Sequence, residues 1–129
     1  EACLERGMRL ELRLARTEAE FLAESVTFAD PDRRWEKAFA RVAASTDSII
    51  YVMPQELGPA PAGVNVHGRC NRWIIYSALA NGLRKASFVT LWNGEPGDGP
   101  GGTEDMVKIA SERGAKVIVI DTNEEFVSA

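Results

Sequence analysis

Apolar residues recur along the chain with two periods, and the shorter one predicts four strands. The runs "SFVTLW" and "KVIVID" are short, apolar and rich in β-branched residues, which is typical of strands inside a parallel sheet. The run "LELRLA" alternates apolar and polar residues, which indicates a strand near an edge or with one face in water. The predicted strands are residues 8–15, 49–54, 87–92 and 116–121.

Between these strands, apolar residues three and four positions apart predict helices. Asp30 followed by Pro31 is typical of an N-cap and a first helical residue. The helix that starts there places Trp35, Phe39 and Val42 on one apolar stripe, which we expect to be buried. The other predicted helices are residues 18–25, 71–83 and 103–113.

The alternation of strands and helices indicates the fold class. Such an order predicts an α/β protein, a three-layer Rossmann-like sandwich with a mainly parallel sheet of about four strands. We expect residues 1–129 to form a single α/β domain. The opening "EACLERG" is typical of a helix that ends at Gly7, so we also expect the chain to be a piece of a longer protein.

The segment "LWNGEPGDGPGGTEDMV" (residues 91–107) has the most unusual composition. Five of the nine residues from Gly94 to Gly102 are glycine and two are proline, which suits neither a helix nor a strand. The segment joins a predicted strand to a helix N-terminus, where free backbone N–H groups and the helix dipole attract anions. In open α/β sheets, ligands bind beyond the carboxyl ends of the strands. We therefore expect this loop to hold a phosphate.

Several residue types around the loop support this expectation. Glycine lets the backbone approach a phosphate, and Thr103 can cap the helix and offer its hydroxyl group. Asn93 and Glu95 can bind sugar hydroxyls or a base edge. Arg69 precedes a predicted helix, where arginine is electrostatically disfavoured, and this points to a bound anion. The predicted ligand-binding residues are Asn93, Gly94, Gly99, Gly101, Gly102, Thr103 and Arg69.

Other features of the loop limit the ligand. It lacks the lysine of the P-loop motif, and four acids repel a highly charged polyphosphate: Glu95, Asp98, Glu104 and Asp105. A monophosphate, a ribose or a cyclic nucleotide suits it better. A plain flexible connection is the alternative reading, in which Thr103 is only an N-cap. Arg72 offers a second cation, either for a phosphate or for ion pairs with Glu95 or Asp98.

Residues 71–122 resemble the last βαβ unit of the SLOG superfamily, a group of Rossmann-like nucleotide-binding domains. Pro100, Gly101, Gly102 and Thr103 stand at the family's PGG-and-GT-type phosphate loop. The stretches "LWNG" and "SVTFADPDRRWEKAFARV" are similar to versions fused behind signalling domains in large bacterial proteins. The resemblance implies a nucleotide-sensing module.

The chain departs from the enzymes of that family. Their loop has one more residue before the threonine, and Met106 falls where they carry a catalytic glutamate. Glu104 is out of register by two positions, about 200° around a helix. Binding survives these departures better than catalysis does, and Glu95 and Glu104 are only weak catalytic candidates.

Composition narrows the function classes. A net charge of −4 argues against a surface that coats nucleic acid. Cys3 and Cys70 have no metal-site spacing, so we expect no metal or other cofactor, and reduced thiols in a cytoplasm. His67, the single histidine, has no nucleophile motif as its partner. Trp92, beside the loop, can stack on a base or pack in the core.

The leading hypothesis is a cytoplasmic sensor or regulatory domain that binds a nucleotide or nucleotide sugar. Its expected partners are that small molecule and the adjacent domains of a larger bacterial protein, but no membrane and no nucleic acid; a homodimer is left open. One alternative is an enzyme that hydrolyses an N-glycosidic bond with Glu95 or Glu104. Another is a protein-interaction module without a ligand. Whether the protein is an enzyme stays open, with binding favoured.

Overall fold

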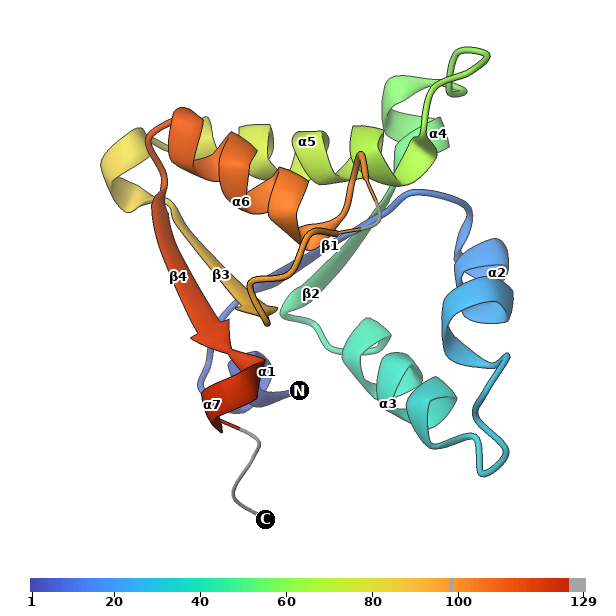
Figure 1. The fold of residues 1–129 in the computed structure, drawn as a ribbon. Helices are drawn as coiled ribbons and strands as arrows, with labels where there is room; N and C mark the ends of the chain where they lie inside the picture. Colours follow the sequence, from blue (N-terminus) through green and yellow to red (C-terminus); the bar gives the residue numbers. More distant parts are fainter. Residues whose placement is uncertain (98, 126–129) are drawn as a thin grey trace. The chain divides into compact units, whose positions relative to one another are not determined.

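The structure, a computed structural model, describes residues 1–97 and 99–125, which belong to two compact units (Figure 1). Unit 1 spans Glu1–Ala62 and unit 2 spans Gly63–Ala129. Each unit contains a parallel sheet of two strands. The α/β class and the parallel pairing predicted from the sequence are confirmed. The four strands form two separate sheets of two strands each, and not the single four-stranded sheet that the sequence predicts.

Unit 1 is built around the strands β1 and β2. They pair in register from Leu10 opposite Ser48 to Leu14 opposite Val52, so that alternate residues of each strand share a face. Leu14 and Val52 are buried, whereas Glu11 points to the opposite face and is exposed. The elements of unit 1 are α1 (Ala2–Glu5), β1 (Leu10–Leu14), α2 (Glu18–Phe21), the π-helical turn η1 (Leu22–Val26), α3 (Arg34–Ala43), β2 (Ser48–Val52) and α4 (Met53–Leu57).

Asp30 binds the start of α3 with its side chain, but the predicted positions are wrong, since Asp30 is not the N-cap residue and Pro31 lies in a turn before the helix. The helix begins at Arg34, and its N-cap residue Arg33 has a left-handed φ of 55°. The Asp30 carboxylate accepts hydrogen bonds from the backbone amides of Arg34, Trp35 and Glu36 at 2.9, 2.8 and 3.0 Å. The intervening turn brings the carboxylate under three of the four free amides, which explains why a charged side chain is buried here.

A capping box begins α2. The Thr17 hydroxyl accepts a hydrogen bond from the Glu20 amide, and the Glu20 carboxylate accepts one from the Thr17 amide at 2.9 Å. The Thr17 hydroxyl also donates to this carboxylate at 2.6 Å, and this bond lowers the pKa of Glu20. When the pKa of a carboxyl group is lower in the folded than in the unfolded protein, the group stabilises the fold at a pH above its unfolded-state pKa. This stabilisation is lost as the pH falls through the folded-state pKa.

The substitution Glu20→Gln should therefore have a pH-dependent effect. We expect a small loss of stability at pH 7 that shrinks below about pH 4.3, because the carboxylate is then protonated in the parent protein as well. Urea unfolding at pH 7 and pH 3 measures this difference. Glu18→Gln, on the same helix and also exposed, is the control. The same loss at both pH values would mean that the charge of Glu20 is irrelevant.

Unit 2 contains the glycine-rich loop. Its strands β3 and β4 are parallel, with Ser87 opposite Lys116 and Trp92 opposite Asp121, and their predicted bounds are confirmed. The predicted helix 71–83 instead starts at Val66, where the side chain of the N-cap Asn65 accepts a hydrogen bond. The elements of unit 2 are α5 (Val66–Leu79), the 3₁₀ turn η2 (Leu83–Lys85), β3 (Ser87–Trp92), α6 (Thr103–Glu112), β4 (Lys116–Asp121) and α7 (Thr122–Glu125).

The core of unit 2 lies between its helices and one face of its sheet. Figure 1 shows α5 and α6 side by side above β3 and β4, and Ile75, Met106 and Ala110 are buried between these layers with Phe88 and Val117 packed against them. The opposite face of the sheet is open. It exposes between 36% and 58% of each of four aliphatic residues: Val89, Leu91, Ile118 and Ile120.

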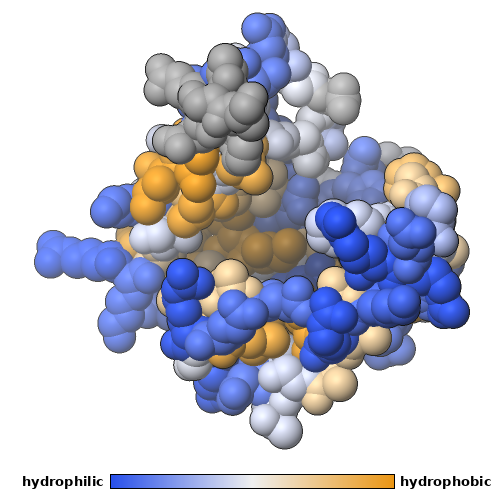
Figure 2. Space-filling model, turned by 90° about the horizontal axis from the view of Figure 1, so that it is seen from below, coloured by the Kyte–Doolittle hydropathy of each residue, from blue (hydrophilic) through white to orange (hydrophobic). Residues whose placement is uncertain are grey.

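Exposed apolar side chains also occur elsewhere on the described surface. Figure 2 shows hydrophobic side chains open to solvent between hydrophilic ones on the side seen from below. Trp35 was predicted to be in the core but is 59% exposed. Phe39 and Val42, the other residues of the stripe, are half-buried, so the expected burial of the stripe is wrong for Trp35 and only partial for these two. A large tryptophan side chain is rarely covered completely.

Candidate functional site

The glycine-rich loop packs against the start of α5. Gly101 has a left-handed φ of 91°, and a Cβ on it would lie 2.8 Å from the Gly68 nitrogen and 2.9 Å from the Gly68 Cα. Only glycine fits here, because a side chain would both strain the backbone and collide with another backbone. The sequence interpretation assigned this freedom to the approach of a phosphate. In the structure, it is used for the approach of α5.

Besides this backbone contact, two hydrogen bonds hold the loop in place. The Asn71 side chain donates to the Gly101 carbonyl at 2.7 Å, and the Gly102 amide donates to the Gly99 carbonyl at 3.0 Å. The N-cap of α6 is Gly102, and Thr103 is the first helical residue. The predicted capping role of Thr103 is therefore wrong, because Thr103 is inside the first turn and Gly102 occupies the N-cap position. Its half-buried side chain sits at the junction of loop and helix.

Two carboxylates of α6 bind the loop that precedes the helix. Asp105 accepts a hydrogen bond from the Gly101 amide at 2.9 Å, and Glu104 accepts one from the Gly97 amide at 3.2 Å. The Arg72 guanidinium approaches the same Asp105 oxygen at 4.0 Å. Asp105 thus takes the place that an anion at this helix start would occupy, and an anionic ligand must compete with it.

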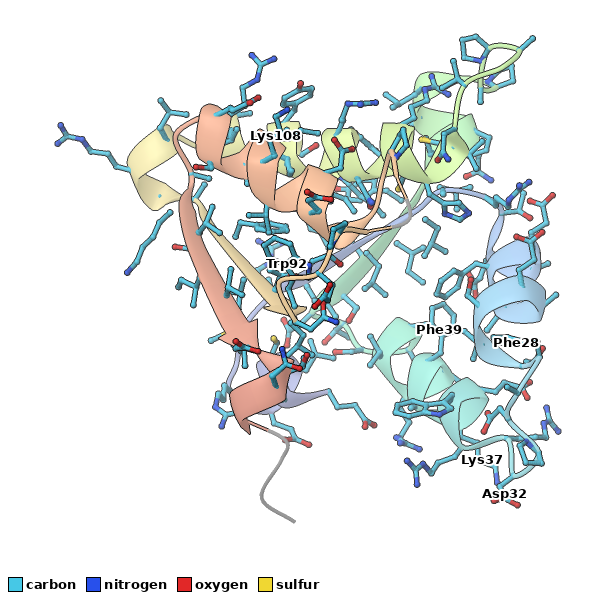
Figure 3. The ribbon with its side chains drawn as sticks, viewed as in Figure 1. Phe28, Asp32, Lys37, Phe39, Trp92 and Lys108 are labelled. Carbon is cyan, nitrogen blue, oxygen red and sulfur yellow. The ribbon has the colours of Figure 1, made fainter. Side chains whose placement is uncertain are left out.

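A shallow recess of about 300 Å³ lies beside these residues. It is lined by Gly99, Pro100, Glu104, Asp105 and Lys108. Lys108, one turn along α6, supplies a cation next to the two acids, and its side chain extends from the helix in Figure 3. The recess is therefore mixed in charge, which suits a small polar ligand better than a polyphosphate.

The residues at the end of β3 form a turn of their own. The Trp92 indole donates to the Glu95 carbonyl at 2.9 Å, and the Asn93 side chain accepts from the Glu95 amide at 3.1 Å. The Asn93 carbonyl accepts from Asn123 at 3.0 Å, and Gly94 has a left-handed φ of 79°. These bonds fix the carboxyl end of the β3–β4 sheet, and ligands of open α/β sheets bind beyond such an end.

Arg69 and Arg72 lie inside α5 rather than before it, which corrects their predicted position. Arg69 is half-buried in the first turns, and Arg72 pairs with Asp105 instead of Glu95. The other proposed ion-pair partner, Asp98, lies outside the described residues. His67 is exposed at the start of α5, and Cys70 is buried.

The two weak catalytic candidates, Glu95 and Glu104, differ in their contacts. Met106 is 8% exposed and belongs to the core. The Glu104 carboxylate binds the Gly97 amide, and Glu95 is exposed. Three residues were missed: Gly68 and Asn71, which contact the loop, and Asn65, which caps α5 at the Gly68 amide. The signal was "NVHG", in which asparagine stands three residues before a glycine, because this spacing is typical of an N-cap bond.

Several site classes are not seen in the described part of the chain. Within residues 1–97 and 99–125, no helix has the length and apolar character needed to cross a membrane. The same residues hold no cluster of three or more potential metal-ligating side chains.

We also compared the chain with known proteins. No protein-family model, no curated protein and no solved structure matches the chain.

Proposed function

We propose that the protein is a sensor or regulatory domain that binds a nucleotide-derived small molecule with at most one phosphate at the β3–α6 loop. With it we propose the finer architecture expected from the sequence, a three-layer Rossmann-like sandwich. The parallel pairing of both sheets, each with helices in its crossover, supports this architecture.

One observation carries the functional proposal: the loop before α6 is in backbone contact with the first turn of α5 at Gly101 and Gly68. The N-termini of two helices therefore lie next to each other, and the positive end of each helix dipole favours an anion, although the Gly101 and Gly68 amides already donate to Asp105 and Asn65. Such a junction favours an anion more than a single helix start does.

The surrounding charges limit the number of phosphate groups that such an anion can carry. Arg72 and Lys108 are the cations near the junction, and Asp105 and Glu104 are the acids. A single phosphate can replace Asp105 at the Gly101 amide and at Arg72. A triphosphate would face the remaining carboxylates with too few cations, and its binding would be weak.

Ligand binding can be tested by thermal shift with AMP, cyclic AMP, ribose 5-phosphate and inorganic phosphate. A ligand at 100 times its Kd should add about 2.7 kcal/mol of stability. We expect Arg72→Gln to weaken binding about tenfold, since a charge-assisted hydrogen bond contributes about 1.5 kcal/mol or more. Arg84→Gln, an exposed arginine of η2 in the same unit, is the matched control and should bind like the parent.

Two results would contradict this proposal. The first is the absence of any shift across the panel. The second is a shift that Arg72→Gln and Arg84→Gln alter equally, because the binding site would then lie elsewhere. Release of free base or ribose phosphate in the same tubes would instead identify the hydrolase.

The second candidate function is a protein-interaction module without a ligand. The open face of the β3–β4 sheet favours it, because Val89 and Leu91 are 58% and 55% exposed on adjacent positions of that face. Contiguous exposed apolar side chains often mark an interaction site. This function would be favoured if no ligand of the panel gave a thermal shift, and if the parent chain self-associated in solution while the Val89→Ser variant did not.

A further inference from the structure

Unit 1 contains an apolar cavity of about 370 Å³ that is open to solvent and shares no lining residue with the recess beside the glycine-rich loop. Its walls come from four elements of this unit, and include Leu12 and Leu14 of β1, Phe21 of α2, Val26 of η1, and Trp35 and Phe39 of α3. Cavities of this volume with mostly apolar walls are typical of small-molecule sites. The function proposed above makes no use of it.

Three aromatic rings give the cavity its shape. Phe21 and Phe39 pack with ring centroids 5.5 Å apart and an interplanar angle of 49°. In Figure 3, Phe39 lies on the side of α3 that faces α2, whereas Lys37 extends from the other side. Trp35 is 59% exposed at the border, and the Arg34 guanidinium lies 5.2 Å from the centroid of its ring. The exposed Trp35 indole, beside the Arg34 guanidinium, therefore offers a flat surface on which the ring of a ligand can stack.

The π-helical turn η1 forms the third wall. Ser25 and Val26 lie in this turn and both line the cavity. π-helical turns are rare and occur frequently at functional sites, because they displace side chains from the positions that an α-helix gives them. Ser25 also supplies a hydroxyl group among the apolar walls.

The charges around the cavity indicate the charge of its ligand. Among the described residues that line it, Glu1 is the ionisable one, and its carboxylate accepts a hydrogen bond from Arg41 at 2.6 Å. This bond lowers the pKa of Glu1 and raises the pKa of Arg41, so both groups stay charged and neutralise each other. A charged ligand would leave water without finding an unpaired opposite charge on the walls, whereas an uncharged ligand avoids this large desolvation cost.

From the volume, the three rings and the paired charges, we infer that this cavity binds an uncharged, planar aromatic small molecule. Its ring plane lies against Trp35 and between Phe39 and the leucines of β1. The inference is independent of the function proposed for unit 2.

Titration calorimetry of the full chain can test this with three probes that share one ring system: 2-naphthalenemethanol, 2-naphthylacetate and 2-naphthylmethylammonium. We expect one molecule of the alcohol to bind per chain and both ions to bind more weakly. Trp35→Ala should weaken the alcohol about tenfold, because it removes one aromatic contact and its apolar area. Phe28→Ala is the matched control, since Phe28 is 75% exposed in the same unit and lies outside the cavity walls.

A second variant keeps the test independent of the exposed tryptophan. Ala38→Leu fills the cavity from α3 and should abolish binding while the circular dichroism spectrum and the unfolding midpoint are preserved. The inference is overturned if no probe binds, if an ion binds best, or if Trp35→Ala and Phe28→Ala weaken the alcohol equally. A dimer that Trp35→Ala dissociates would also overturn it, because a second copy would then cover the cavity.

Discussion

Gly101→Ala should lower the free energy of unfolding by about 2–5 kcal/mol. Two costs add: a non-glycine residue at a left-handed φ costs about 1–2 kcal/mol, and forcing a side chain into a packed contact costs about 1–3 kcal/mol. The second cost arises because the new Cβ would meet the Gly68 backbone at 2.8 and 2.9 Å, and a backbone yields less than a flexible side chain. Urea unfolding followed by circular dichroism measures the loss.

Gly114→Ala separates the two costs. Gly114 follows α6 with a similar φ of 83°, but a Cβ there would meet Leu83 at an ordinary 4.0 Å. Its substitution should cost about 1–2 kcal/mol, the backbone cost alone. If both variants lose the same stability, then the contact between the loop and α5 is loose. The dipole junction on which the proposed function rests would then be in doubt.

Asp30→Ala is expected to have the second-largest effect, a loss of about 2 kcal/mol or more. The substitution removes the acceptor of three backbone hydrogen bonds and leaves the first amides of α3 without this partner. It also removes a negative charge from the positive end of the helix. Urea unfolding of the full chain, followed by circular dichroism, measures this loss.

Asp32→Ala is the control for this prediction. Asp32 lies in the same turn but is exposed (Figure 3), so its removal should change stability by less than about 0.5 kcal/mol. Asp30→Asn should fall between the two, because its side-chain oxygen still accepts but carries no charge. An effect of Asp32→Ala as large as that of Asp30→Ala would mean that overall charge, not capping, stabilises α3.

The fold was predictable where the local pattern decides the structure. The runs that became β3 and β4 are apolar, β-branched and bounded by turn residues, and their bounds were correct. The start of α5 was missed because Gly68 and the prolines before it suggested a loop. The bond from Gly68 to Asn65 and the contact with Gly101 override that weak helix preference.

The place of the glycine-rich loop between β3 and α6 was also predictable, since a strand-to-helix loop is visible in the sequence. The role of each residue was not. Asp105 and Glu104 looked like acids that repel a ligand, but they bind loop amides at 2.9 and 3.2 Å. Such bonds depend on the path of a loop whose glycines allow many conformations, so spacing along the chain does not determine them.

The parallel pairing of the strands has a consequence for folding kinetics. Leu10 pairs with Ser48 and Ser87 with Lys116, so each sheet closes over 38 (48 − 10) or 29 (116 − 87) residues of chain. Loop-closure entropy differs by less than about 0.5 kcal/mol between these lengths. Neither sheet can form as a fast local hairpin, and both must wait for their crossover helices. Refolding should thus occur on a millisecond or slower timescale, with helical signal gained no later than strand pairing.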